Sequence, residues 1–155
     1  MKKDFVILVA EDDPSDAELL RLAIRRAGMV NPVLFVNDGE QAIEYLQGNG
    51  EFADREKYPF PKIVITDLKM PRRTGLELLE WLRKHPECKV IPTVLMSGSN
   101  LTGDIGKAYS IGANSYFRKP SSLNELTELI KLLNVYWTTA EVPAIQQQNC
   151  DQINE

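Results

Sequence analysis

Acidic side chains follow two strongly apolar stretches of the chain. Residues 63–66 form a short β-branched run typical of a buried strand, and Asp67 follows it directly. A second apolar run, residues 5–10, is followed by the acidic residues 11–13. A carboxylate at the end of a buried strand is costly unless it meets water, a cation or a metal ion. Asp67 is therefore the first candidate for chemistry.

Two further strand ends offer a hydroxyl group and a cation. Ser97 follows the apolar stretch 90–96, and Lys119 follows residues 115–118. If these strands are parallel, their carboxyl ends share the edge of the sheet where ligands bind in open α/β folds. Clustered carboxylates repel one another, and Mg²⁺ relieves this by binding one or two of them together with waters and a phosphate oxygen. The ammonium group of Lys119 and the hydroxyl group of Ser97 suit the same phosphoryl oxygen.

The elements that must position these residues alternate along the chain. Strands are predicted at 5–10, 33–36, 63–66, 90–96 and 115–118. Helices are predicted from Pro14 to the stop at Gly28, at 40–47, 76–84 and 101–111, and from the Ser121–Ser122 cap to about Trp137. Five strands alternating with five helices predict a doubly wound α/β fold with a parallel sheet.

The chain of 155 residues is predicted to form one domain, residues 1–137. Residues 48–61 are rich in Gly, Pro and charge and are predicted to form a long, insert-like loop. Residues 138–155 are polar and are predicted to be a disordered tail.

Composition excludes several partners and places the chain in the cytoplasm. The net charge of −4 and the pI of about 5.1 argue against nucleic acid or an acidic membrane as the main partner. No apolar run approaches transmembrane length, and the acidic residues 11–13 interrupt the only stretch that resembles a signal peptide. Cys88 and Cys150 show neither metal-ligand spacing nor a disulfide framework.

Four motifs occur together in the order and at the spacing of a known family. They are ILVAEDD at 7–13, ITDLKMP at 65–71 with Gly75 after it, VLMSGS at 94–99, and GANSYFRKP at 112–120. This set closely resembles the receiver domain of bacterial two-component response regulators, from residue 5 to about residue 137. The resemblance implies the flavodoxin-like strand order 2-1-3-4-5.

The resemblance also implies roles for individual residues. It makes Asp67 the phosphoacceptor, which attacks a phosphohistidine and becomes an aspartyl phosphate. Implied ligands of Mg²⁺ are Glu11, Asp12, Asp67 and the backbone carbonyl of Lys69. The remaining implied roles are Ser97 as switch hydroxyl, Tyr116 as switch aromatic, and Lys119 as phosphate-binding lysine before a cis bond to Pro120. Such a domain catalyses only its own phosphorylation and dephosphorylation and is not otherwise an enzyme.

The chain offers no segment for an output domain after residue 137, so we expect a stand-alone receiver. Its expected partners are a sensor histidine kinase or a phosphotransfer protein, and a downstream protein target. The long loop 48–61 and the Tyr136–Trp137 ending resemble stand-alone receivers that partner phytochrome-type histidine kinases.

Three other functions remain as alternatives. A Mg²⁺-dependent phosphatase with an aspartyl nucleophile needs a second Asp two residues after it, where this chain has Lys69. A flavodoxin-like nucleotide or flavin binder needs a phosphate loop after the first strand, where the acidic residues 11–13 repel phosphate. A degenerate receiver would act as a binding module without phosphorylation. The purely structural interpretations are that Asp67 caps a strand end and that Tyr116 is a core residue.

The last predicted helix suggests self-association. At 100° per residue one stripe of the helix must cover the sheet, namely Leu126, Leu129, Ile130, Leu133 and Trp137. Leu132 and Val135 lie outside the stripe, and Tyr136 borders it. We therefore predict a symmetric homodimer through Leu132, Val135 and Tyr136.

Overall fold

The sheet has five parallel strands. The computed structural model describes residues 5–86, 88–98 and 102–143. The strands are β1 (Ile7–Ala10), β2 (Val33–Val36), β3 (Ile63–Asp67), β4 (Thr93–Ser97) and β5 (Ser115–Arg118). Their order is β2-β1-β3-β4-β5, with every neighbouring pair parallel. The predicted fold class and strand order are confirmed.

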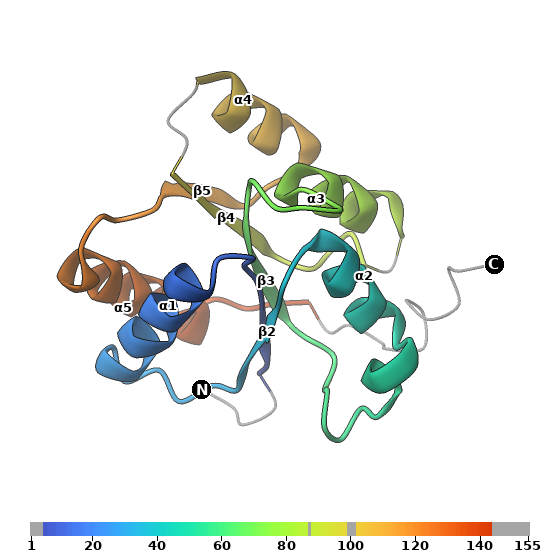
Figure 1. The fold of residues 1–155 in the computed structure, drawn as a ribbon, viewed down its shortest axis with the longest axis horizontal. Helices are drawn as coiled ribbons and strands as arrows, with labels where there is room; N and C mark the ends of the chain where they lie inside the picture. The colour runs from blue at the N-terminus through green and yellow to red at the C-terminus, as the bar shows by residue number, and fades with distance from the viewer. Residues whose placement is uncertain (1–4, 87, 99–101, 144–155) are drawn as a thin grey trace.

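Five helices cover the two faces of this sheet. They are α1 (Pro14–Arg26), α2 (Gly39–Gln47), α3 (Gly75–Lys84), α4 (Thr102–Ile111) and α5 (Leu123–Thr139). Helices α1 and α5 lie side by side on one face, and α2, α3 and α4 lie on the other (Figure 1). Each strand therefore leads into a helix on one face or the other, and the carboxyl ends of all strands share one edge.

The alternation of side chains along β1 explains why both faces are apolar. Ile7 and Val9 pack with α1 and α5, whereas Leu8 and Ala10 pack with α2 and α3. A strand buried on both faces must be apolar throughout, and all four residues of β1 are buried.

Helix α5 uses the apolar stripe that its sequence predicts. Its residues Leu126, Ile130, Leu133 and Trp137 are buried, and Leu129 is partly buried against the same core cluster. Leu132, Val135 and Tyr136 are the large apolar side chains that this helix leaves exposed. The predicted stripe is therefore confirmed. Its residues are buried together because residues at helical spacing lie on one side of the helix.

Three element boundaries differ from the prediction by two or more residues, and the first is the start of β1 at Ile7 and not at residue 5. Strand β4 begins at Thr93 and not at residue 90, because Val90 lies in an exposed turn and Pro92 has no N–H for the sheet. Helix α5 runs to Thr139, and Ala140 and Val142 after it pack against the core. Residues 144–155 lie outside the described part of the chain, so the disordered tail stays a prediction.

Two local expectations are wrong. The peptide bond between Lys119 and Pro120 is trans, where the resemblance implied cis. Cys88 is buried and disulfide-bonded, which the spacing of the cysteines did not indicate.

The long loop 48–61 is packed and contains a short 3₁₀ helix, Gly50–Ala53. The buried ring of Phe52 packs against the rings of Tyr45 and Tyr58, each with its centroid 5.1 Å away. The guanidinium group of Arg55 donates to the carbonyls of Tyr45 and Leu46 at the end of α2, at 2.8 and 3.0 Å. An aromatic cluster and a capped helix end therefore order a segment that lacks any sequence period.

Among the described residues, the helices are too short or too polar to span a membrane.

Candidate functional site

The register of the sheet brings the predicted site residues to one level. Ala10 pairs with Thr66 across β1 and β3, so Glu11 follows at the level of Asp67. Asp67 pairs with Met96, and Ser97 pairs with Arg118, so Lys119 lies one step beyond Ser97. The backbone N–H of Lys119 donates to the Ser97 carbonyl at 2.8 Å. The predicted convergence at the carboxyl edge is confirmed.

Three carboxylates meet at this edge. Glu11, Asp12 and Asp67 each offer one oxygen, and these oxygens lie within 4.8 Å of one another. Asp12 is exposed, Glu11 is buried, and 12% of the Asp67 side chain is exposed. Hard oxygen ligands at this spacing, with one open side, suit a small divalent cation that keeps part of its water shell.

The ammonium group of Lys119 lies among carboxylates from three elements. Nζ donates to Oδ2 of Asp67 at 2.9 Å, to Oδ2 of Asp16 at 2.9 Å, and to Oε1 of Glu11. Burial disfavours the charged ammonium, but these three hydrogen bonds outweigh it and raise the pKa of Lys119 above its usual value. Lys119 is therefore positively charged throughout the physiological pH range.

For Glu11, the effect of burial on the pKa outweighs that of its ionic contacts. Burial raises the pKa of Glu11 to about 7, although Lys119 beside it favours the ionised form. The nearby Asp67 carboxylate adds to the increase. A cation at this edge would lower the same pKa, because it stabilises the ionised carboxylate. The four carboxylates Glu11, Asp12, Asp16 and Asp67 surround one ammonium group, so the site has more acidic groups than Lys119 alone can balance.

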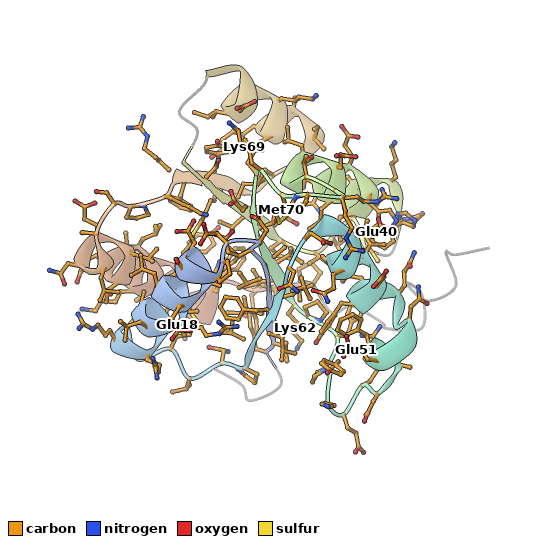
Figure 2. All side chains as sticks on the ribbon, viewed as in Figure 1. Glu18, Glu40, Glu51, Lys62, Lys69 and Met70 are labelled. Carbon is orange, nitrogen blue, oxygen red and sulfur yellow. The ribbon has the colours of Figure 1, made fainter. Side chains whose placement is uncertain are left out.

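The segment after β3 is held close to Asp67. Oδ1 of Asp67 accepts the N–H of Leu68 at 2.7 Å, and the N–H of Gly75 donates to the Leu68 carbonyl at 2.9 Å. A Cβ at Gly75 would lie 2.0 Å from the Asp67 carbonyl oxygen, so only glycine fits there. Lys69 is exposed beyond the carboxyl end of β3, whereas Lys62 lies at the other end of that strand (Figure 2).

The two residues implied as switches occupy different environments. The Ser97 side chain is buried at the end of β4. Tyr116 is partly buried against Leu68, Leu79, Leu95 and Ala108, and its N–H donates to the hydroxyl of Tyr109 at 3.2 Å. This packing agrees with the purely structural interpretation of Tyr116 as a core residue. Its role as a switch stays a prediction.

Asp13, next to Glu11 and Asp12, caps the N-terminus of α1. Its Oδ1 accepts the N–H groups of Ser15 and Asp16 at 2.8 and 3.1 Å. Asp16, in the first turn of the same helix, contacts Lys119 and is a site residue that the sequence analysis missed. The sequence did contain a signal for this contact. Asp16 lies in the first turn of the helix that begins directly after the acidic residues 11–13, which keeps it near the carboxyl end of β1.

A second ionic group lies beside the site and was also missed. Arg72 donates from Nε and Nη2 to the buried carboxylate of Asp38, at 2.7 and 3.1 Å. Nε of Arg73 donates to Glu40 at 2.5 Å. These contacts join the β3–α3 segment to the start of α2, where Asp38 also accepts the N–H of Gln41 at 2.8 Å.

Comparison with known proteins identifies the family. The model of the response regulator receiver domain matches residues 7–131. Response regulator Rcp1 of Synechocystis is 29% identical over 140 residues, which cover 90% of this chain and 93% of Rcp1. A crystal structure of Rcp1 in its Mn²⁺-bound form matches with a TM-score of 0.79.

Two further solved structures are similar over 90% of this chain and 99% of their own. Response regulator RPA3017 in red light signalling of R. palustris is 36% identical, with a TM-score of 0.86. The phosphorylated cyanobacterial phytochrome response regulator RcpA is 30% identical, with a TM-score of 0.82. The chain is thus homologous to phytochrome response regulators and belongs to the family of response regulator receiver domains.

Proposed function

We propose that Asp67 accepts a phosphoryl group from a phosphohistidine of a sensor histidine kinase. The supporting observation is the Lys119 ammonium, 2.9 Å from Asp67 Oδ2 and beside the acidic group of Glu11, Asp12 and Asp67. An Asp67 oxygen attacks phosphorus while the phosphorus–nitrogen bond breaks, and the departing imidazole keeps the electron pair and takes up a proton. Lys119 balances charge on the transferred oxygens.

We further propose that Glu11, Asp12, Asp67 and the Lys69 carbonyl bind Mg²⁺. Three carboxylate oxygens within 4.8 Å of one another support this proposal. Rcp1, a relative of this chain, has been crystallised with Mn²⁺. A divalent cation there would neutralise the carboxylates, so that an anionic phosphoryl donor can approach Asp67.

The switch residues belong to the same proposal. After phosphorylation of Asp67, the Ser97 hydroxyl would donate a hydrogen bond to a phosphoryl oxygen. This would move the carboxyl end of β4 and free space for the Tyr116 side chain to turn inward. Ser97→Ala should still be phosphorylated, but backbone chemical shifts around β4 and β5 should change less than in the wild type. Equal shift changes in both proteins would exclude Ser97 as the switch.

The phosphoacceptor is tested with acetyl phosphate as the donor. Intact-mass measurement should detect one phosphoryl adduct on the wild type with Mg²⁺ and none after Mg²⁺ is removed by chelation. Asp67→Asn should take up no phosphate under either condition, with Asp54→Asn on the exposed loop as a matched control that behaves like the wild type. Equal labelling of Asp67→Asn would show that another residue is the acceptor.

The proposed kinase partner is of the phytochrome type. The basis is the likeness to RcpA, RPA3017 and Rcp1 over most of each chain. Phosphotransfer from a panel of histidine kinases and phosphotransfer proteins onto this chain tests the proposal, and the phytochrome-type kinases should transfer fastest. We also propose that residues 1–137 form the receiver domain. Its phosphorylation would be read by a downstream protein target.

We also propose a homodimer through α5. Leu132, Val135 and Tyr136 are 69%, 66% and 60% exposed, and with Glu128 and Lys131 they line an open groove of about 400 Å³. Glu128 and Lys131 pair with each other at 3.1 Å within the helix, and a twofold axis through the groove would allow the same pair to form between two copies.

The dimer is tested by sedimentation velocity at several concentrations, with and without phosphorylation. The wild type should sediment as a dimer in at least one state, and the double variant Leu132→Glu/Val135→Glu should remain a monomer. A wild type that stays monomeric at high concentration in both states would exclude the dimer.

A further inference from the structure

The Lys119 ammonium has three N–H donors, and carboxylates of three different elements accept from it. Glu11 follows β1, and Asp67 ends β3. Asp16 belongs to the first turn of α1, and its Oδ2 lies 2.9 Å from Nζ. Lys119 therefore joins α1 to the two strands, and each donor has an ionic acceptor.

Asp16 differs from the other two acceptors. Glu11 and Asp67 belong to the group of oxygens spaced to bind a cation, and Asp16 does not. Asp16 is fixed by its own helix, because its N–H bonds to the capping carboxylate of Asp13 at 3.1 Å. Its negative charge lies at the N-terminus of α1, where the helix dipole stabilises it.

A cation bound by Glu11 and Asp67 competes with Lys119 for the same oxygens. The structure offers Lys119 one carboxylate outside this competition, the Asp16 side chain. Without Asp16, the positive charge of Lys119 would rest entirely on Glu11 and Asp67 and oppose a second positive charge there.

We propose that Asp16 is a positioning residue that retains Lys119 beside the site while Glu11 and Asp67 bind a divalent cation, and so strengthens cation binding. This inference rests on the proposed function of the same site. Asp16→Asn should weaken the binding of Mn²⁺ or Mg²⁺ about fivefold, the factor that corresponds to two unit charges at 4 Å in water.

The affinity is measured by calorimetric titration of the purified protein with Mn²⁺ alone and with Mg²⁺ alone. Asp16→Glu should restore tight binding, because it returns a carboxylate within reach of Lys119. Glu18→Gln is the matched control: it removes one charge from the same helix, and its side chain is 67% exposed and pairs with Arg21 at 3.5 Å. Its affinity should equal that of the wild type.

A double-mutant cycle separates an effect through Lys119 from a general loss of charge. In the Lys119→Gln background, Asp16→Asn should leave the cation affinity nearly unchanged. An equal loss of affinity in both backgrounds would overturn the inference. Without metal, the ¹⁵Nζ signal of Lys119 should show faster hydrogen exchange in Asp16→Asn than in Glu18→Gln, and equal exchange would also contradict it.

The outcomes distinguish this inference from the proposed function. If the wild type binds the cation and is phosphorylated, but Asp16→Asn binds as tightly, only the role of Asp16 is wrong. If the wild type binds no cation and Asp67 takes up no phosphate, the proposed function fails and the inference fails with it.

Discussion

Two ionic clusters lie near the carboxyl end of β3, and they differ in charge balance. The Lys119 cluster comprises Glu11, Asp12, Asp16, Asp67 and Lys119, four carboxylates and one cation. The Arg72 cluster comprises Asp38, Glu40, Arg72 and Arg73, with each carboxylate paired to one guanidinium group.

The difference in charge balance supports the assignment of the proposed chemistry to the Lys119 cluster. In the Arg72 cluster, a bidentate pair and a helix cap satisfy the Asp38 carboxylate, so no acceptor needs another ligand. In the Lys119 cluster, one ammonium serves three carboxylates and leaves excess negative charge near a buried Glu11. Such an excess favours a cation and responds to pH, whereas the balanced cluster joins two segments of the fold.

The largest expected effect comes from removing the ammonium group of Lys119. Lys119→Gln should slow phosphorylation by acetyl phosphate on the order of a hundredfold at saturating Mg²⁺, because charge on the transferred oxygens loses its fixed counter-charge. The rate is measured by intact mass against time. Lys84→Gln, at the exposed end of α3, makes the same chemical change away from both clusters and from the proposed dimer face, and should match the wild type. A Lys119→Gln rate within a few-fold of wild type would remove Lys119 from the chemistry.

A second prediction concerns pH. Because burial raises the pKa of Glu11 to about 7, a cation must displace its proton at lower pH. The Mg²⁺ dissociation constant should therefore increase about tenfold per pH unit below 7 and become constant above it. Calorimetry between about pH 6 and about pH 8 measures this change. Glu11→Gln should bind more weakly with little dependence on pH, and a wild type without pH dependence would contradict the assignment.

The stability of the metal-free protein should show the opposite sign. A carboxyl group whose pKa is raised on folding stabilises the folded state below its unfolded pKa of 4.5, and this contribution is lost as the pH rises through about 7. Glu11→Gln should reduce that loss in urea denaturation. Variants of the Arg72 cluster keep Glu11, so their stability should fall with rising pH as that of the wild type does.

The smallest expected effect lies in the Arg72 cluster. Asp38→Ala removes the cap of α2 and should lower the free energy of unfolding by about 1 kcal/mol from the cap alone. Asp38→Asn keeps a capping oxygen and should lose less, so the difference isolates the cap. Both are measured by urea denaturation with and without Mg²⁺. A loss that depends on Mg²⁺ would show that the two clusters are coupled and would break the comparison.

Local pattern predicted most of the fold. The strands predicted at 33–36 and 115–118 agree with β2 and β5, because short apolar runs between turn residues leave few alternatives. Strand β4 was extended too far, since Val90 and Ile91 look like strand residues although they lie in a turn. The packed segment at 48–61 has no period, and its order comes from aromatic contacts with Tyr45 and from Arg55 at the end of α2.

The meeting of Glu11, Asp67, Ser97 and Lys119 followed from the strand pattern alone, because parallel strands bring every residue that follows a carboxyl end to one edge. The three-dimensional fold was needed to show which carboxylates contact Lys119 and which cation pairs with Asp38. Asp16 and Lys119 are 103 residues apart, and Asp38 and Arg72 are 34 apart. Such contacts depend on how a helix turn or a loop lies against the sheet, and no local periodicity encodes that placement.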